Sequence, residues 1–162
     1  ETAITLRPDN ILPLVNTSLA YARLGDSVKA EAKLKQALVI DPDSAEANFN
    51  MGLLKAEQND FTEAEKYLRA ALKTDSNFPE AAYYLAILIS KENLDESVTL
   101  CRKAYKLRPR DARYAYTLAF YLRQQGQIDD AIEILQKLVK QQPDYSDASM
   151  LLRALYEEKK KP

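Results

Sequence analysis

Four prolines recur at a nearly fixed interval along the 162-residue chain, and this interval limits the possible folds more than any other feature. Pro8, Pro42, Pro109 and Pro143 each follow a stretch that favours helix, and they are separated by 34, 67 and 34 residues. The middle interval equals 34 plus 33, and Ser76 stands where the missing proline would be. Because a period of this length is typical of repeat architectures, we expect a chain built from copies of one small structural unit.

Small and apolar residues keep the same register in every copy. One small column lies in the first half of each unit, and a second small column and an apolar column lie in the second half. The members of these columns are Ser18, Gly52, Ala86 and Ala119; Ala30, Ala64, Ser97 and Ala131; and Leu34, Leu68, Cys101 and Leu135. Small side chains allow two helices to approach closely, so we interpret the small columns as the seam of a helical hairpin.

Each unit contains two segments with apolar residues at helical spacing. We expect first helices at 12–24, 45–58, 80–91 and 112–125, and second helices at 27–40, 61–74, 95–107 and 128–141. The residues between them, such as Gly25, Asn59 and Gly126, tolerate the left-handed conformation that ends a helix. One hairpin cannot bury its apolar face alone, whereas stacked hairpins can. The sequence therefore predicts an all-α fold of stacked antiparallel helix pairs.

The spacing, the small columns, Tyr21 in the first helix and the closing proline resemble the tetratricopeptide repeat family. This resemblance implies a right-handed superhelical solenoid of antiparallel helix pairs. We assign repeats to residues 11–44, 45–78, 79–111 and 112–145, and the end of a preceding repeat to residues 1–10. The sequence lacks the family's frequent tryptophan near the start of the first helix, where Leu14, Asn48, Ala82 and Ala115 stand. It does not begin with Met, and we interpret it as a piece of a longer protein.

Residues 146–162 begin like a fifth first helix, but Arg153 falls in the first small column. Burial of a guanidinium group in a tight seam is costly. We therefore expect no second helix to dock there, and we interpret 146–162 as a C-terminal capping helix and tail.

The sequence offers few groups for chemistry. It has no histidine, and its one cysteine, Cys101, lies in the apolar column, where we expect a buried structural thiol. Asp41, Asp43 and Glu46 lack the spacing and the turn glycine of a calcium loop, so helix capping and turn formation are the better interpretation. We predict no catalytic residue, no metal site and no cofactor, and therefore a protein that is not an enzyme.

Charge and hydropathy narrow the partner class. Lys and Arg number 23 and Asp and Glu number 24, so the net charge of −1 gives no general attraction to nucleic acid. No apolar run approaches the roughly 18 residues of a membrane span. The first ten residues show no recognisable signal peptide, and the compartment stays open. We expect a protein or peptide partner, with self-association as an alternative.

The resemblance also implies where a partner would bind, because the first helices line the concave face in this family. On these helices the residues turned away from the seam are rich in apolar and aromatic side chains. The candidate peptide-binding groove consists of Val15, Asn16, Leu19, Phe49, Asn50, Leu53, Tyr83, Tyr84, Ile87, Tyr116 and Phe120. An apolar strip of this size usually marks a partner site, and packing between repeats is the alternative for any one residue.

Asn16 and Asn50 occupy equivalent positions in the first two repeats. A side-chain amide can pair with both groups of an extended backbone, and some family members hold peptides with such an asparagine ladder. Here the ladder breaks at Tyr84 and Thr117, and simple solvation of both asparagines is the alternative.

The leading hypothesis is a scaffold or adaptor that holds a peptide or helix of a partner protein in the concave groove. Two alternatives remain open. The chain could be the non-catalytic arm of a larger enzyme, or a self-assembling scaffold.

Overall fold

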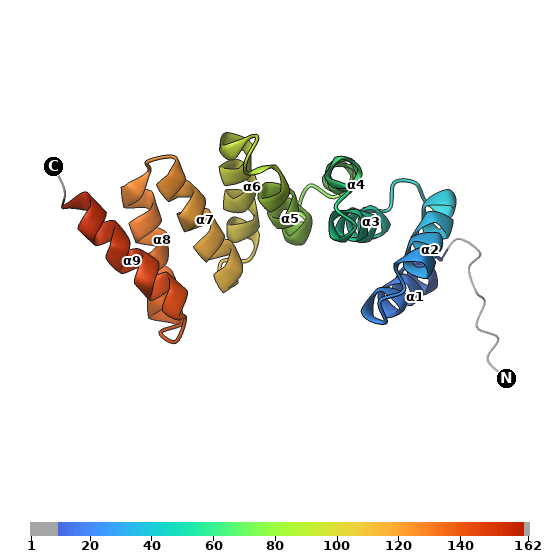
Figure 1. Cartoon of the computed structure of the whole chain (residues 1–162), viewed down its shortest axis with the longest axis horizontal. Helices are drawn as coiled ribbons and strands as arrows, with labels where there is room; N and C mark the ends of the chain where they lie inside the picture. Colours follow the sequence, from blue (N-terminus) through green and yellow to red (C-terminus); the bar gives the residue numbers. More distant parts are fainter. Residues whose placement is uncertain (1–9, 161–162) are drawn as a thin grey trace. The chain divides into compact units, whose positions relative to one another are not determined.

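A computed structural model describes residues 10–160 of the chain. Within that range all regular structure is helical (Figure 1). The helices in order are α1 (Leu12–Arg23), α2 (Ser27–Ile40), α3 (Ala45–Glu57), α4 (Phe61–Thr74), α5 (Pro79–Ile89), α6 (Leu94–Leu107), α7 (Ala112–Gln124), α8 (Ile128–Gln141) and α9 (Ser146–Lys159). The predicted end of a preceding repeat lies outside the described residues, apart from Asn10.

The chain divides into two compact units, Glu1–Ala81 and Ala82–Pro162, and each is described by itself. In the first unit α1 packs on α2, α3 packs on α4, and α3 also contacts both α1 and α2. In the second unit α7 packs on α6 and α8, and α9 packs on α8 and touches α7. The all-α fold of helix pairs is thus confirmed, while the superhelical winding and the repeat boundaries stay predictions.

The turns inside the hairpins form as their residues predict. Gly25, Asn59 and Gly126 have φ angles of 78°, 62° and 76°, which is the left-handed region that ends a helix. The residue that follows is the N-cap of the second helix. The side chain of Asp26 accepts a hydrogen bond from the Lys29 amide at 3.0 Å, and Asn93 caps α6 in the same way at 3.1 Å. These short turns place two antiparallel helices side by side.

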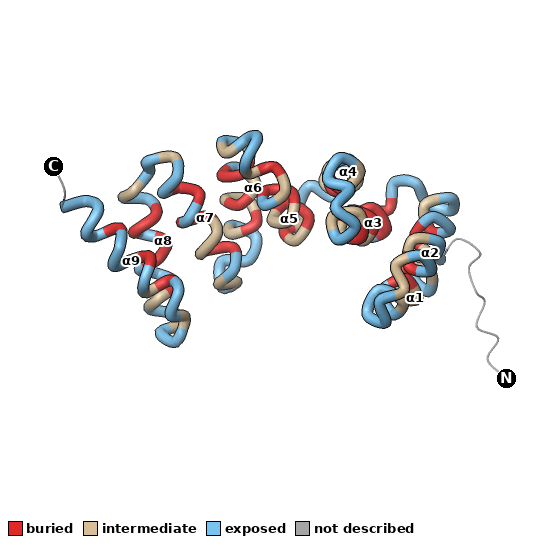
Figure 2. The backbone as a smooth tube through the Cα atoms, viewed as in Figure 1, coloured by how far each residue is buried: buried red, intermediate tan, exposed pale blue. Residues whose placement is uncertain are grey.

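The predicted seam and apolar columns form the core. Buried residues lie on the sides of the helices that face their neighbours (Figure 2). Two serines in the seam are fully buried, and each hydroxyl donates to a carbonyl of its own helix turn: Ser18 to Val15 at 2.6 Å and Ser97 to Asn93 at 2.9 Å. No buried hydroxyl of the seam is therefore left unpaired within residues 10–160, and the close approach of the helices is retained.

Candidate peptide-binding groove

Within the first unit, α1 and α3 carry candidate groove residues at equivalent positions. On α1, Leu12 and Leu19 stand seven residues apart, a spacing that keeps both on one helix face. On α3, Glu46, Asn50 and Leu53 follow the same spacing. Because α1 and α3 contact each other, these stripes belong to neighbouring helices.

A small hollow of about 80 Å³ opens between these two helices. Leu19 of α1 and both Asn50 and Leu53 of α3 line it, together with Ala22 and Glu57. The structure therefore brings three of the predicted groove residues together around one apolar opening with an amide beside it. A side chain of a bound segment could fill such an opening while the amide pairs with its backbone.

The two asparagines differ in their contacts. The Asn50 amide nitrogen donates to the Glu46 carbonyl at 2.8 Å, one turn earlier on the same helix. Its side-chain oxygen accepts no hydrogen bond within residues 10–160. Asn16 is exposed, and its side chain makes no hydrogen bond to any other part of the described chain. Both amides thus retain groups that can pair with a peptide backbone, and solvation of both remains the alternative.

One of the predicted groove columns packs inside the protein instead. Val15, Phe49, Tyr83 and Tyr116 each stand three residues before a small seam residue, which places them one turn along the seam side of the helix. Val15 is only 5% exposed and packs with Ile11, Ala37 and Ala47, so it belongs to the core and not to the surface of a groove.

The aromatic members of this column have ring partners within their own units. The Phe49 ring lies 4.8 Å from that of Phe78, and the Tyr116 ring lies 5.7 Å from that of Tyr145. Phe78 and Tyr145 each precede the next first helix, so the two contacts are equivalent. Packing between successive helices is therefore the main role of this column.

Tyr83 links α5 to α7 within the second unit. Its ring lies 4.8 Å from that of Tyr114, and its hydroxyl lies 3.4 Å from the hydroxyl of Thr117. Tyr84 is half-buried, and its ring packs edge-on against Tyr83 at 5.5 Å. These contacts fix the orientation of the Tyr83 ring on the surface between the two helices.

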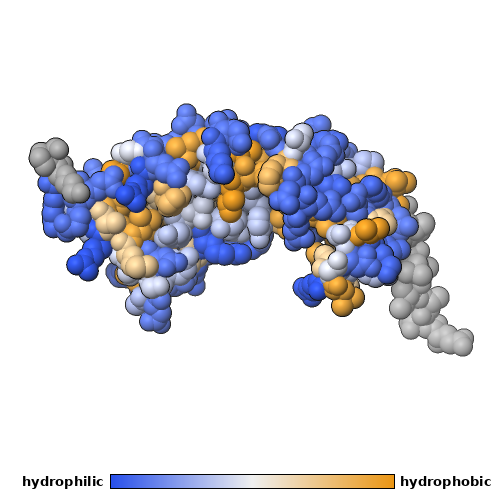
Figure 3. All heavy atoms as spheres, viewed as in Figure 1, coloured by the Kyte–Doolittle hydropathy of each residue, from blue (hydrophilic) through white to orange (hydrophobic). Residues whose placement is uncertain are grey.

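A different column carries the exposed apolar side chains. Leu19, Leu53, Ile87 and Phe120 each follow a small seam residue directly. Leu19, Ile87 and Phe120 are 37%, 41% and 38% exposed, and Leu53 is half-buried. Figure 3 shows that hydrophobic residues reach the surface among mostly hydrophilic ones. The apolar surface of the first helices therefore rests on this column, which we call the exposed column.

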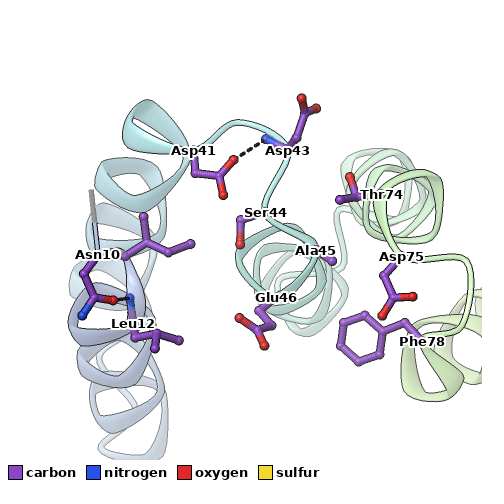
Figure 4. Close-up of a pocket in the computed structure, with 11 residues that line it drawn as sticks. Asn10, Leu12, Asp41, Asp43, Ser44, Ala45, Glu46, Thr74, Asp75 and Phe78 are labelled. Atoms are coloured by element: carbon purple, nitrogen blue, oxygen red, sulfur yellow. Dashed lines mark hydrogen bonds between the residues drawn. The ribbon is translucent and has the colours of Figure 1, made fainter. Parts of the chain in front are cut away.

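A wider hollow of about 470 Å³ lies at the start of α1 and α3 (Figure 4). Its lining joins the apolar side chains of Leu12 and Phe78 to several carboxylates. The residues that line it are Asn10, Ile11, Leu12, Asp41, Asp43, Ser44, Ala45, Glu46, Thr74, Asp75 and Phe78. The repeat pattern of the sequence does not indicate this hollow, because much of its wall comes from the two loops between repeats.

The acidic residues of this hollow have local roles. Asp41 accepts a hydrogen bond from the Asp43 amide at 3.2 Å, and Asp75 accepts one from the Asn77 amide at 2.8 Å. Ser44 caps α3 by accepting from the Ala47 amide. The predicted turn and capping chemistry at Asp41 is confirmed. No group of three metal-binding side chains forms among residues 10–160.

Cys101 is fully buried, as its place in the apolar column predicts. Burial disfavours the thiolate and raises the pKa of the Cys101 thiol to about 12. A thiol of this kind is a poor nucleophile at neutral pH.

None of the helices in the described part of the chain has the length and apolar character that a membrane crossing needs.

Comparison with known proteins identifies a family. Two family models, both described as tetratricopeptide repeat, match residues 49–112 and 88–155. No curated protein matches the sequence.

Several solved structures are similar in fold. YrrB, described as a TPR protein with an unusual peptide-binding site, is 20% identical with a TM-score of 0.83, over 94% of this chain and 79% of YrrB. PilF of Pseudomonas aeruginosa is 21% identical with a TM-score of 0.78, over 91% of this chain and 68% of PilF. MamA from Desulfovibrio magneticus RS-1 is 22% identical with a TM-score of 0.70, over 85% of this chain and 78% of MamA. The two family matches together span residues 49–155, and the helix pairs and their seam agree with them. The chain therefore belongs to the tetratricopeptide repeat family.

Proposed function

We propose that this protein is an interaction scaffold whose first helices hold a peptide or helix of a partner protein. The observation that carries the proposal is the exposed column of Leu19, Leu53, Ile87 and Phe120. Each repeat places one apolar side chain of this column on its first helix, and three of the four are more than a third exposed. Apolar side chains repeated on a surface at the period of the fold are typical of a partner site.

The small hollow of the first unit suggests how a segment would be held. Leu19 and Leu53 would contact an apolar side chain of the partner, and Asn50 would pair with its backbone. The carboxylates of the wider hollow, such as Glu46 and Asp75, would favour a basic residue in the same segment. In the second unit, Ile87 and Phe120 would supply further apolar contacts. A groove that continues across both units stays a prediction.

The similarity to YrrB supports the same class of function. That protein is described as having a peptide-binding site, and its fold matches nearly the whole of this chain. At 20% identity the match carries the fold, and peptide binding by this chain is our proposal. We propose no catalytic role, because the one thiol is buried with a raised pKa. If the chain is the non-catalytic arm of a larger enzyme, it would bind its partner through the same surface. That alternative therefore differs from the scaffold only in what the rest of the protein does.

The proposal can be tested without knowledge of the partner. Peptides would be selected from a random display library against the wild-type chain, and their affinities measured by fluorescence anisotropy. We expect Leu19→Ser combined with Leu53→Ser, or Ile87→Ser combined with Phe120→Ser, to weaken binding by at least about tenfold, because apolar anchors dominate such interfaces. A matched control is Val28→Ser combined with Val39→Ser, since both valines are exposed on the second helix α2.

The control should leave the affinity within about twofold, and all variants should keep the helical circular dichroism of the wild type. If the groove variants bind as tightly as the control, the first helices are not the site. The alternative of self-assembly is tested by light scattering on the chain without peptide. It requires that the measured molar mass rises with protein concentration.

A further inference from the structure

The small hollow between α1 and α3, which we call the α1–α3 hollow, has an apolar floor. Its floor consists of side chains that are almost fully buried: Ser18, Ala30, Leu34 and Leu54. The one hydroxyl among them, that of Ser18, already donates to the Val15 carbonyl at 2.6 Å. The floor therefore requires no hydrogen bond from an occupant and favours an apolar side chain.

The volume of the hollow limits which apolar side chain can enter. It measures about 80 Å³, whereas an apolar cavity that holds a benzene molecule measures about 150 Å³. A branched aliphatic side chain, that of valine, leucine or isoleucine, therefore fits the α1–α3 hollow. An aromatic ring is too large to enter it fully.

The second unit carries different side chains at the equivalent positions. Tyr121 stands where Leu54 stands in the first unit, and it is 7% exposed within the core of the second unit. Gln124 stands where Glu57 does, so the negative charge is absent there. The combination of an aliphatic floor with a carboxylate thus belongs to the first unit.

The mouth of the hollow lies on a surface that stacked repeats leave open. Phe120 of α7 occupies the position that Leu53 has on α3. Helices lie on both sides of α7, because its Tyr114 packs on Tyr83 of α5 and α9 touches α7. Phe120 is nevertheless 38% exposed. Further repeats beside α1 or α4 would therefore not cover the column that contains Leu53.

A carboxylate without a partner stands at the mouth. Glu57 lines the hollow and is exposed, and its side chain forms no ion pair or hydrogen bond with any residue from 10 to 160. Lys55 of the same helix is held by Glu31 at 2.9 Å. Arg23, at the equivalent position of α1, does not line the hollow. The charge that complements this mouth is therefore a lysine or arginine of the bound segment.

We propose that the α1–α3 hollow selects partner segments in which a valine, leucine or isoleucine has a lysine or arginine beside it or next but one. The aliphatic side chain enters the hollow between Leu19 and Leu53, and the basic side chain pairs with Glu57. This inference rests on the proposed function, to which it adds a sequence preference. An aromatic residue at the same position of the segment is disfavoured by its size.

A variant with a filled hollow isolates this preference. Ala22 lines the hollow and is exposed, so Ala22→Leu should fill the opening without disturbing the core. Ala20→Leu is the matched control, because Ala20 is exposed on the same helix and lies outside the hollow. Both variants should keep the unfolding midpoint of the wild type.

A random peptide library would be depleted on the 162-residue Ala22→Leu chain and then selected on the wild-type chain. We expect the remaining peptides to carry valine, leucine or isoleucine near lysine or arginine. By fluorescence anisotropy they should bind wild type and Ala20→Leu alike, and Ala22→Leu about tenfold more weakly.

Substitutions in one such peptide separate size from charge. Replacement of its aliphatic residue by alanine should weaken binding about tenfold, because several buried carbon atoms are lost, and replacement by phenylalanine should also weaken it. Replacement of its basic residue by glutamine should weaken binding to wild type about threefold. The same replacement should leave binding to the Glu57→Gln chain unchanged, because the charge that it meets is absent.

Two sets of outcomes distinguish this inference from the proposed function. Depletion that removes every binder, a phenylalanine peptide that binds as tightly as the original, or a basic residue whose replacement acts equally on wild type and Glu57→Gln would overturn this inference alone. An undepleted library that yields no binder would overturn the proposed function and this inference with it. Binders that neither Leu19→Ser with Leu53→Ser nor Ile87→Ser with Phe120→Ser weakens would do the same.

Discussion

Gly52 of α3 lies so close to Leu68 of α4 that a Cβ atom added at Gly52 would be 2.8 Å from Leu68 Cγ. The same added atom would lie 3.2 Å from the carbonyl oxygen of Ala64. Leu68 is almost fully buried, so its side chain has little room to move away. At Gly52, the close approach of the second helix of the same pair thus requires a small residue in the first helix, as the register of the repeat predicts.

Replacement of Gly52 should therefore destabilise the first unit. We expect Gly52→Leu to lower the free energy of unfolding by roughly 1–3 kcal/mol, because the larger side chain overpacks the seam. Urea denaturation followed by circular dichroism measures this change. The control is Ala32→Leu, which introduces the same side chain at an exposed position of α2 and should have little effect. Equal midpoints for Gly52→Leu and wild type would show that the seam is assigned wrongly.

The period of the repeat explains how much of the fold could be predicted. Three of the predicted second helices, at 27–40, 61–74 and 128–141, have the bounds that the structure shows. The helix predicted at 80–91 ends at Ile89, because the amide of Asn93 turns back to the Ile89 carbonyl at 2.8 Å. This turn lies in the third repeat, 79–111, which is one residue shorter than the other three. Helix pairs follow from local spacing, whereas the exact end of a helix depends on such turns.

The candidate groove was predicted less completely. Val15 and Leu19 both lie off the seam position of α1 in the sequence, yet one is buried and the other is exposed. The difference depends on the neighbouring helix: Val15 packs on Ala37 and Ala47, which come from α2 and α3. A single sequence does not show how far the next repeat covers the first helix. The spacing of three residues between Val15 and Ser18 is the signal that could have separated the two columns.

The two columns should respond differently to truncation. We expect Tyr116→Ala to lower the free energy of unfolding by roughly 1–3 kcal/mol, because the Tyr116 ring packs on Tyr145. Phe120→Ala should cost less than about 1 kcal/mol, since the Phe120 side chain is more than a third exposed. Denaturant titration of both variants measures the difference. A larger loss for Phe120→Ala than for Tyr116→Ala would contradict the assignment of Tyr116 to packing.

An ion-pair network between α2 and α3 predicts a pH dependence of stability. Glu31 accepts contacts from Lys35 at 2.8 Å, Lys55 at 2.9 Å and Gln58 at 3.3 Å. The hydrogen bond from Lys35, followed by that from Lys55, lowers the pKa of Glu31 to about 2. Because the folded-state pKa lies below that of the unfolded chain, the stabilisation is present above the unfolded value and is lost as pH falls through the folded one.

Glu31→Gln should accordingly destabilise the chain at neutral pH by roughly 1–2 kcal/mol after allowance for solvent screening. The difference from wild type should shrink as pH falls from about 5 to about 2. Denaturation midpoints across this range measure it. Glu133→Gln serves as a control, because Glu133 makes only an exposed pair with Lys137 and should show a smaller effect. A difference at Glu31 that is independent of pH would rule out the network as its cause.

The buried thiol gives a further prediction. Cys101 should react with a thiol reagent no faster than the second unit unfolds, because its side chain is inaccessible and its pKa is raised to about 12. The labelling rate at pH 8 should therefore follow the opening of the fold as urea is added. Rapid labelling of the native chain would mean that the apolar column around Cys101 is open.

The central claim, that the exposed column of the first helices binds the partner, is tested most directly by methyl NMR of the leucine, isoleucine and valine side chains. A peptide selected against the chain would be titrated into the labelled protein. We predict that the methyl signals of Leu19, Leu53 and Ile87 shift progressively with peptide, while those of Val28 and Val39 on the exposed face of α2 stay in place. Shifts confined to Val28 and Val39, with Leu19, Leu53 and Ile87 unchanged, would contradict the claim.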